Sequence, residues 1–335
     1  MNDVCESTKG LVANLTMSKL PKLSPFLSSK AMGSDVERQL DTYAHQMLTG
    51  NPAGMREFYD SCDKRDRLFL AVARCAFMGA LLNTDVQWFD EICADAVAYV
   101  GTADIPMASL AAELLDSWLR GWLNVRVGYP QWLLELDFSN LPDAWRIDAA
   151  CIAVRALTVS DSFAMADCLA RSLMVLPCEV QPLPEQKIAL LLSSSLFNVE
   201  NGNMAVSGAQ YEQALKLAEE NNALLPMMLG DMQLEYARNE LCANSSEQFR
   251  FRLIEESNRV FESYLAFRNQ LYGKTDMDKL TRRQFQIALM LRRKDSYKKI
   301  GLCMGLSIGR VRNLVMELYE KMYVHRRRQL IEKVY

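Results

Sequence analysis

The residues best placed to do chemistry lie near the C-terminus, in the segment GLSIG from Gly305 to Gly309. Its spacing matches G-x-S-x-G, in which a serine at a sharp strand-to-helix turn is the nucleophile of a hydrolase. Such a serine needs a histidine and an acid to activate it. The preceding residues have a helical pattern, however, and the chain has only two histidines, His45 and His325. We therefore interpret Ser307 as the N-cap of a helix.

The residues that follow Ser307 have side chains suited to reading DNA. Arginine and asparagine form paired hydrogen bonds with the base edges of guanine and adenine in the major groove. The apolar residues here recur at helical spacing and predict one buried stripe, made of Val311, Leu314, Val315, Leu318 and Met322. The face left exposed near the start of this helix then carries Gly309, Arg310, Arg312, Asn313 and Met316.

Two shorter helices are predicted to position this one. Thr281 is a suitable N-cap for the first, and Asp295-Ser296 begins the second. Gly305 can adopt the left-handed conformation that closes the second helix. Three apolar helical segments separated by short breaks are typical of a helix-turn-helix domain.

From Leu280 to Ile331 the segment resembles, without a gap, the LuxR-type (GerE-like) helix-turn-helix domain of bacterial transcription regulators. The matching positions are Leu280, Thr281, Arg283, Ile287, Ser296, Lys298, Ile300, Met304, Ser307, Val311, Leu318, Lys321, Met322, Val324 and Arg327. Five positions depart from the usual residue of the family: Gln284 (Glu), Lys294 (Gly), Gly301 (Ala), Arg310 (Thr) and Leu314 (His). We expect the DNA preference to differ from that of the relatives at Arg310 and Leu314.

The resemblance implies roles for individual residues. The positions that touch bases in the family are Arg312, Asn313 and Met316, and those that touch phosphates are Lys298, Lys299, Ser307, Arg310 and Lys321. The fourth helix of the family, which contributes to dimer contacts on DNA, falls on Arg327 to Tyr335. Leu330 and Val334 are its candidate dimer residues.

The charge of the chain is divided unevenly. Residues 273–335 hold 16 of the 38 Lys and Arg residues and 6 of the 41 Asp and Glu residues, a net charge of +10. The remaining 22 basic and 35 acidic residues give residues 1–272 a charge of −13. A basic module of this size is typical of nucleic-acid binding.

The composition predicts an all-α fold, because hydrophobic residues make up 50% of the chain while Gly (15) and Pro (10) are scarce. We expect four parts: an N-terminal arm at 1–33, a helical domain at 34–272 that senses or dimerises, a linker at 273–279 and the four-helix domain at 280–335. In the helical domain the patterns predict helices at 35–49, 52–62, 64–82, 84–99, 105–123, 142–158, 161–176, 184–199, 203–220, 223–242 and 245–272.

The pair at 184–199 and 203–220 resembles a tetratricopeptide repeat, with Gly202, Ser207, Tyr211, Ala214 and Leu215 at the turn, small, aromatic, Ala and Leu positions. The preceding pair fits the same scheme more loosely, with a repeat of about 42 residues in place of about 34. Stacked pairs form a concave surface that binds a peptide, a protein or a small molecule. The last helix, at 245–272, is either the closing helix of this stack or a dimer seam.

Sites for enzymatic chemistry are absent from the patterns tested. The chain has no phosphate-binding G-x-x-x-x-G-K-[ST] loop, no H-E-x-x-H and no Cys/His cluster for a metal, so we expect no enzyme, no metal and no cofactor. Nine scattered cysteines indicate reduced thiols in a cytoplasm. The longest apolar run, from Leu68 to Leu82, is short and contains Arg74, so no membrane span is expected.

The sequence thus favours a cytoplasmic bacterial transcription regulator that binds double-stranded DNA as a homodimer. RNA polymerase, a peptide or a small-molecule effector would act at the helical domain. One alternative is a helical-repeat adaptor that binds proteins and keeps the helix-turn-helix only as a packing module. Another is a module like region four of sigma factors, because SYKKIGLCMGLSIGRVRNL at 296–314 suits both families.

Overall fold

The computed structural model describes residues 35–66, 68–102, 107–177, 182–230, 234, 245–273 and 280–334. Within these ranges the fold contains α-helices and no strands, which confirms the predicted all-α class. The expected arm at 1–33, the linker residues 274–279 and nearly all of the predicted helix beyond residue 230 lie outside the described residues. The helices are α2 (Asp35–Leu48), α3 (Met55–Ser61), α4 (Phe69–Leu82), α5 (Val86–Thr102), α6 (Ala108–Trp122), α7 (Gln131–Leu134), α8 (Asp143–Val159), α9 (Phe163–Met174), α10 (Pro184–Glu200), α11 (Met204–Glu220), α12 (Leu224–Gly230), α14 (Glu247–Leu271), α15 (Arg282–Arg292), α16 (Tyr297–Met304), α17 (Ile308–Lys321) and α18 (Arg327–Val334).

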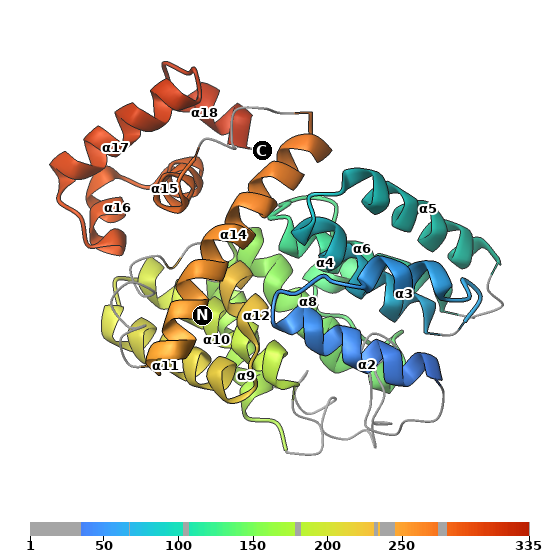
Figure 1. The fold of residues 1–335 in the computed structure, drawn as a ribbon. Helices are drawn as coiled ribbons and strands as arrows, with labels where there is room; N and C mark the ends of the chain where they lie inside the picture. The colour runs from blue at the N-terminus through green and yellow to red at the C-terminus, as the bar shows by residue number, and fades with distance from the viewer. Residues whose placement is uncertain are drawn as a thin grey trace.

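The long helix α14 runs through the middle of the molecule (Figure 1). It packs against α4, α5 and α12 of the N-terminal helices. Helices α15 to α18 form a separate group beside its C-terminal half (Figure 1). With 25 residues, α14 is about 37 Å long at the helical rise of about 1.5 Å per residue. It therefore links the helical N-terminal part of the chain to the C-terminal group.

Helix α4 forms the centre of the N-terminal core. Twelve of its fourteen residues are buried, as is typical of a helix that is apolar on all sides. Its Gly79 leaves room for a neighbouring ring, because a β-carbon there would stand 3.2 Å from the ring of Trp88. Trp88 is 1% exposed, and the other four tryptophans are half-buried. All five tryptophans thus contribute to the packing of the core.

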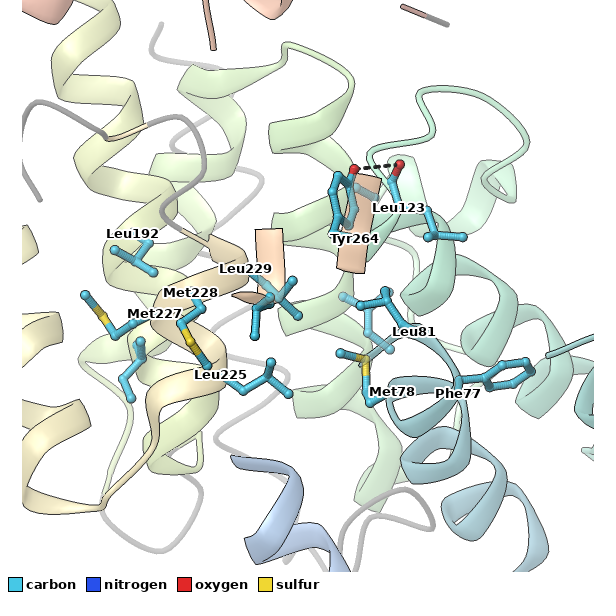
Figure 2. Close-up of a cluster of buried hydrophobic side chains, with 14 of the residues drawn as sticks. Phe77, Met78, Leu81, Leu123, Leu192, Leu225, Met227, Met228, Leu229 and Tyr264 are labelled. Atoms are coloured by element: carbon cyan, nitrogen blue, oxygen red, sulfur yellow. Dashed lines mark hydrogen bonds between the residues drawn. The ribbon is translucent and has the colours of Figure 1, made fainter. Parts of the chain in front are cut away.

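A second part of the core lies where α4, α10, α12 and α14 come together. Figure 2 shows side chains of α4 and α12 in one buried cluster with Tyr264 of α14. The hydroxyl group of Tyr264 donates a hydrogen bond of 3.3 Å to the backbone oxygen of Leu123. Asn124 donates from its side-chain amide to the same hydroxyl group at 3.0 Å. These bonds fix α14 against the end of α6.

The pair α10 and α11 forms an antiparallel hairpin with little space between the helices. Gly202 in the connecting turn has a φ of 73°, a left-handed conformation that glycine adopts without strain. The hydroxyl groups of Ser195 and Ser207 lie 2.8 Å apart between the two helices. Small side chains at these two positions permit the close approach. The tetratricopeptide-like repeat scheme itself stays a prediction.

The start of helix α4 differs from the sequence prediction because two aspartate side chains form turns in front of it. Helix α4 begins at Phe69 rather than at residue 64. The carboxylate of Asp63 accepts from the backbone N–H of Arg65 at 2.9 Å, and that of Asp66 accepts from Leu68 at 2.7 Å. Such bonds offer the backbone an alternative to the helix. The short helix α7, directly after Pro130, was not predicted.

The apolar stripe of α14 is covered by other helices of the same chain. Its members are all buried except Leu271, which is half-buried: Leu253, Ser257, Val260, Tyr264, Phe267 and Leu271. They face α4, α5, α12 and the C-terminal helices. Of the two interpretations of this helix, the geometry favours the closing helix of the stack, because a buried stripe has no free surface for a second copy.

Candidate nucleic-acid interface

The C-terminal group begins with a fully formed helix cap. The hydroxyl oxygen of Thr281 accepts from the backbone N–H of Gln284 at 3.2 Å, and the side-chain oxygen of Gln284 accepts from the N–H of Thr281 at 3.2 Å. The amide of Gln284 also accepts from Lys321 at 2.9 Å and donates to Glu317 at 3.3 Å. A glutamate could not donate the last of these bonds. Gln284 thus ties α15 to α17 through a donor that a carboxylate at this position would lack.

The turn between α16 and α17 has a conformation that its sequence explains. Ser296 caps α16 by accepting from the N–H of Lys299 at 3.2 Å. Gly305 ends the helix with a φ of 62° and a ψ of 33°, as expected for a left-handed C-terminal residue. The N–H of Leu306 donates to the backbone oxygen of Gly301 at 2.8 Å. The chain therefore turns sharply into α17.

Ser307 caps α17, as the sequence predicted. Its hydroxyl oxygen accepts from the backbone N–H of Arg310 at 3.2 Å, one of the N–H groups that has no partner within the helix. The stripe predicted to be buried is buried: Val311, Leu314, Val315, Leu318 and Met322 are at most 5% exposed. Leu314 lies in this core, so a histidine at this position would place a polar ring against apolar neighbours.

The opposite face of α17 is open to solvent at its N-terminal end. All five residues predicted for this face are exposed: Gly309, Arg310, Arg312, Asn313 and Met316. Met316 has 62% of its surface exposed, which is unusual for a large apolar side chain. Arg310 lies 4.0 Å from Glu317, and about half of each side chain stays exposed. An exposed helix face with arginine, asparagine and one apolar side chain can form hydrogen bonds with base edges and contact a thymine methyl group.

The residues expected to contact phosphates divide into two groups. Lys298, Ser307 and Arg310 are exposed around the N-terminal ends of α16 and α17. Lys321 and Lys299 are half-buried, and both already have protein partners. Lys321 donates to Gln284 at 2.9 Å, and Lys299 forms ion pairs with two carboxylates.

Those two carboxylates belong to a group of four charged residues, here named the Glu200 cluster: Glu200, Arg293, Asp295 and Lys299. The ammonium group of Lys299 lies 2.5 Å from Glu200 and 3.0 Å from Asp295. The guanidinium group of Arg293 lies 2.5 Å from Glu200 and 3.3 Å from Asp295. Glu200 is the last residue of α10, so the cluster joins α16 to the N-terminal helices. No local pattern in the sequence predicted this contact.

The pKa of Lys299 agrees with this geometry. Burial lowers the pKa of its ammonium group, but hydrogen bonds to Glu200 and Asp295 and the charges of both carboxylates outweigh that effect. The result is a pKa above the ordinary value of lysine, so the group stays charged at neutral pH.

A second contact joins the C-terminal group to α14. The ring of Phe285 meets the rings of Phe261 and Tyr264 edge to face, with centroids 5.7 and 6.1 Å apart. Arg282 donates to the backbone oxygen of Ser257 at 3.0 Å. These contacts anchor α15 on the long helix.

Leu330 and Val334, the candidate dimer residues, have 0% of their surface exposed within a single chain. Helix α18 packs against α15, and Arg327 binds the backbone oxygens of Leu291 and Asp295 at 2.8 and 3.1 Å. A dimer contact through α18 would therefore have to use its exposed face, which includes Arg328. The structural role of Arg327 was not recognised in the sequence.

Several cysteine thiols have a raised pKa. Burial is the main cause that raises the pKa of the thiols of Cys75, Cys93 and Cys303 to about 11. Such thiols are poor nucleophiles at neutral pH. In the part of the chain that the structure describes, no cluster of three or more His, Cys, Asp and Glu side chains could hold a metal ion. None of the helices in these ranges is long and apolar enough to span a lipid bilayer.

Comparison with known proteins found no matching family model, no matching curated protein and no matching solved structure.

Proposed function

We propose that this chain is a DNA-binding transcription regulator of the LuxR type, which reads promoter DNA through α17 under the control of its helical N-terminal domain. The observation that carries the proposal is the two-sided character of α17. Four apolar side chains fix one side of the helix in the core, while Arg310, Arg312, Asn313 and Met316 are exposed on the other side.

The charge distribution supports the same proposal. The net charge of +10 on residues 273–335 would attract the phosphate backbone, whereas base contacts would supply the sequence preference. Lys298, Ser307 and Arg310 are exposed where the family contacts phosphates. We therefore assign the base contacts to Arg312, Asn313 and Met316. We assign the first phosphate contacts to Lys298, Ser307 and Arg310.

The proposed regulator acts as a homodimer on DNA. Two copies would place their α17 helices in successive major grooves, with half-sites about 10 base pairs apart. The helical N-terminal domain would receive the regulatory input from a peptide, a small molecule or RNA polymerase. The exposed side of α18, rather than its buried side, is the surface proposed for contact between copies at the DNA.

The adaptor alternative has one observation in its favour. Phe285 and Arg282 pack against α14, so the C-terminal helices also stabilise the long helix of the N-terminal part. A module kept only for packing would need these contacts but would not need exposed arginines on α17. The exposed face of α17 therefore favours DNA binding over a packing role.

The salt dependence of binding separates the two functions. We expect the full chain to bind a fluorescein-labelled DNA duplex of mixed sequence, with an affinity that falls steeply as salt increases. Replacing the exposed Lys298 with glutamine should reduce the slope of log K against log salt by about 0.9, the contribution of one phosphate contact. An affinity that is undetectable or independent of salt would support the adaptor instead.

A further inference from the structure

Lys299 lies at a position where LuxR-type domains contact phosphate. Its ammonium group is, however, already paired with two carboxylates of its own chain. Glu200 lies 2.5 Å from its ammonium group and Asp295 lies 3.0 Å from it. Asp295 belongs to the C-terminal group itself, but Glu200 belongs to α10. One of the two carboxylates that neutralise this cation therefore comes from the N-terminal domain.

Burial makes this contact stronger than an ordinary surface ion pair. The side chains of Glu200 and Arg293 are each 7% exposed, whereas Lys299 is 35% exposed. Screening by solvent is weak around partly buried charges, and removing one partner from such a group leaves the others without compensation. Lys299 therefore stays with Glu200 as long as α10 and α16 remain together.

Other contacts hold α10 against α16 at the same place. The thiol of Cys303 donates to the backbone oxygen of Val199, with the sulfur 3.5 Å from that oxygen. The guanidinium group of Arg293 lies 5.3 Å from the ring centre of Phe163, which is the first residue of α9. The turns that end α10 and begin α9 thus both face the start of the helix-turn-helix.

We infer that Glu200 is an autoinhibitory contact, which withholds Lys299 from the DNA backbone while the N-terminal domain remains docked on α16. The inference rests on the proposed function. Separation of α10 from α16 would release Lys299 from one of its two carboxylates, leaving Asp295, and would remove the negative charge of Glu200 from beside α16 in the same movement. The N-terminal domain would regulate DNA affinity in this way without covering α17.

The test compares four forms of the full chain on one duplex of mixed sequence, with affinity measured by fluorescence anisotropy over a range of salt concentrations. They are the parent chain, Glu200→Gln, Lys299→Gln and the double variant. Glu220→Gln is the matched control, because it also removes one carboxylate but from the exposed end of α11, where Glu220 is paired with Lys216 at 3.9 Å. Thermal unfolding of each variant shows that it is folded.

Autoinhibition predicts that Glu200→Gln steepens the slope of log K against log salt by about 0.9, the effect of one added phosphate contact. Lys299→Gln in the parent chain should leave the slope unchanged, because the lysine is already paired with Glu200 and Asp295. In the Glu200→Gln background, Lys299→Gln should return the slope of log K against log salt to the parent value. The control Glu220→Gln should have the slope of the parent chain.

Two results would overturn the inference while leaving the proposed function intact. In the first, the parent chain binds DNA with a steep salt dependence and Glu200→Gln has the same slope. In the second, Lys299→Gln alone lowers the slope by about 0.9, which would mean that the lysine contacts DNA in the docked state. The second result does not depend on Glu200→Gln being stable. Absence of salt-dependent binding in every form would instead reject the proposed function.

Discussion

The backbone oxygen of Leu306 faces Gly301 so closely that a β-carbon on residue 301 would stand 2.6 Å from it. The N–H of the same leucine donates to the backbone oxygen of Gly301 at 2.8 Å. The residue before the capping serine of α17 is thus held against α16 by its own backbone. This contact accounts for the glycine at residue 301.

Gly301→Ala should therefore destabilise the chain even though alanine favours a helix. The added methyl group must displace backbone atoms, and forced packing of this kind costs about 1–3 kcal/mol. Gly309→Ala is the control, since a β-carbon there would have Ser307 Oγ as its nearest neighbour at 4.0 Å. That change should be neutral or stabilising by up to about 1 kcal/mol. Denaturant unfolding of both variants decides the matter, and equal stabilities would contradict the close contact.

Arg327 should contribute more to stability than its neighbour Arg328. Arg327 donates to the backbone oxygens of Leu291 and Asp295, so Arg327→Ala leaves buried acceptors without a charged donor. We expect a loss of about 1.5–3 kcal/mol in the free energy of unfolding. The side chain of Arg328 is 90% exposed and pairs with Glu332 at the surface, so Arg328→Ala should cost at most about 1 kcal/mol. Similar losses for the two variants would refute this role.

The thiol of Cys303 should react slowly with iodoacetamide at neutral pH and faster in alkaline solution. Its pKa of about 11 means that little thiolate exists until the pH approaches that value. Above the ordinary thiol pKa of 9.0, the unfolded chain loses this proton first, so the stability that Cys303 contributes declines as the pH rises from about 9 to about 11. Peptide mass spectrometry can follow the reaction at this one residue.

Cys93 is the matched control for that measurement, because burial raises its pKa to about 11 as well but it lies on α5, away from the contact between α10 and α16. Glu200→Gln should accelerate labelling of Cys303 and leave labelling of Cys93 unchanged. Equal acceleration at both cysteines would indicate general loosening of the fold, and no change at either would show that Glu200 does not hold this contact closed.

Local sequence features predicted the helix caps and the buried stripe of the C-terminal group well, because these depend on neighbouring residues. Thr281, Ser296 and Ser307 each cap the helix that follows them, and Gly305 adopts the left-handed conformation expected of it. The stripe of α17 is buried as its spacing required. A cap or a periodic stripe involves residues only a few positions apart, so the sequence shows it directly.

Contacts between distant residues could not be predicted in the same way. Glu200 and Lys299 are 99 positions apart, and nothing in either local pattern links a helix C-terminus to a lysine in a later domain. Leu330 and Val334 were assigned to a dimer surface because the LuxR-type resemblance places a dimer helix at residues 327–335. Their periodicity shows that one side of α18 is covered, but it does not say whether α15 or a second chain covers it.

The central claim is that α17 reads DNA, and selection of bound sequences from a randomised duplex library tests it most directly. The full chain should enrich an inverted repeat with half-sites about 10 base pairs apart. Arg312→Ala should enrich the same repeat with the preference lost at one base pair in each half-site, at a cost of about 1–3 kcal/mol in binding to the parent's site. Failure to enrich any sequence, or an identical preference for the parent chain and Arg312→Ala, would contradict the account.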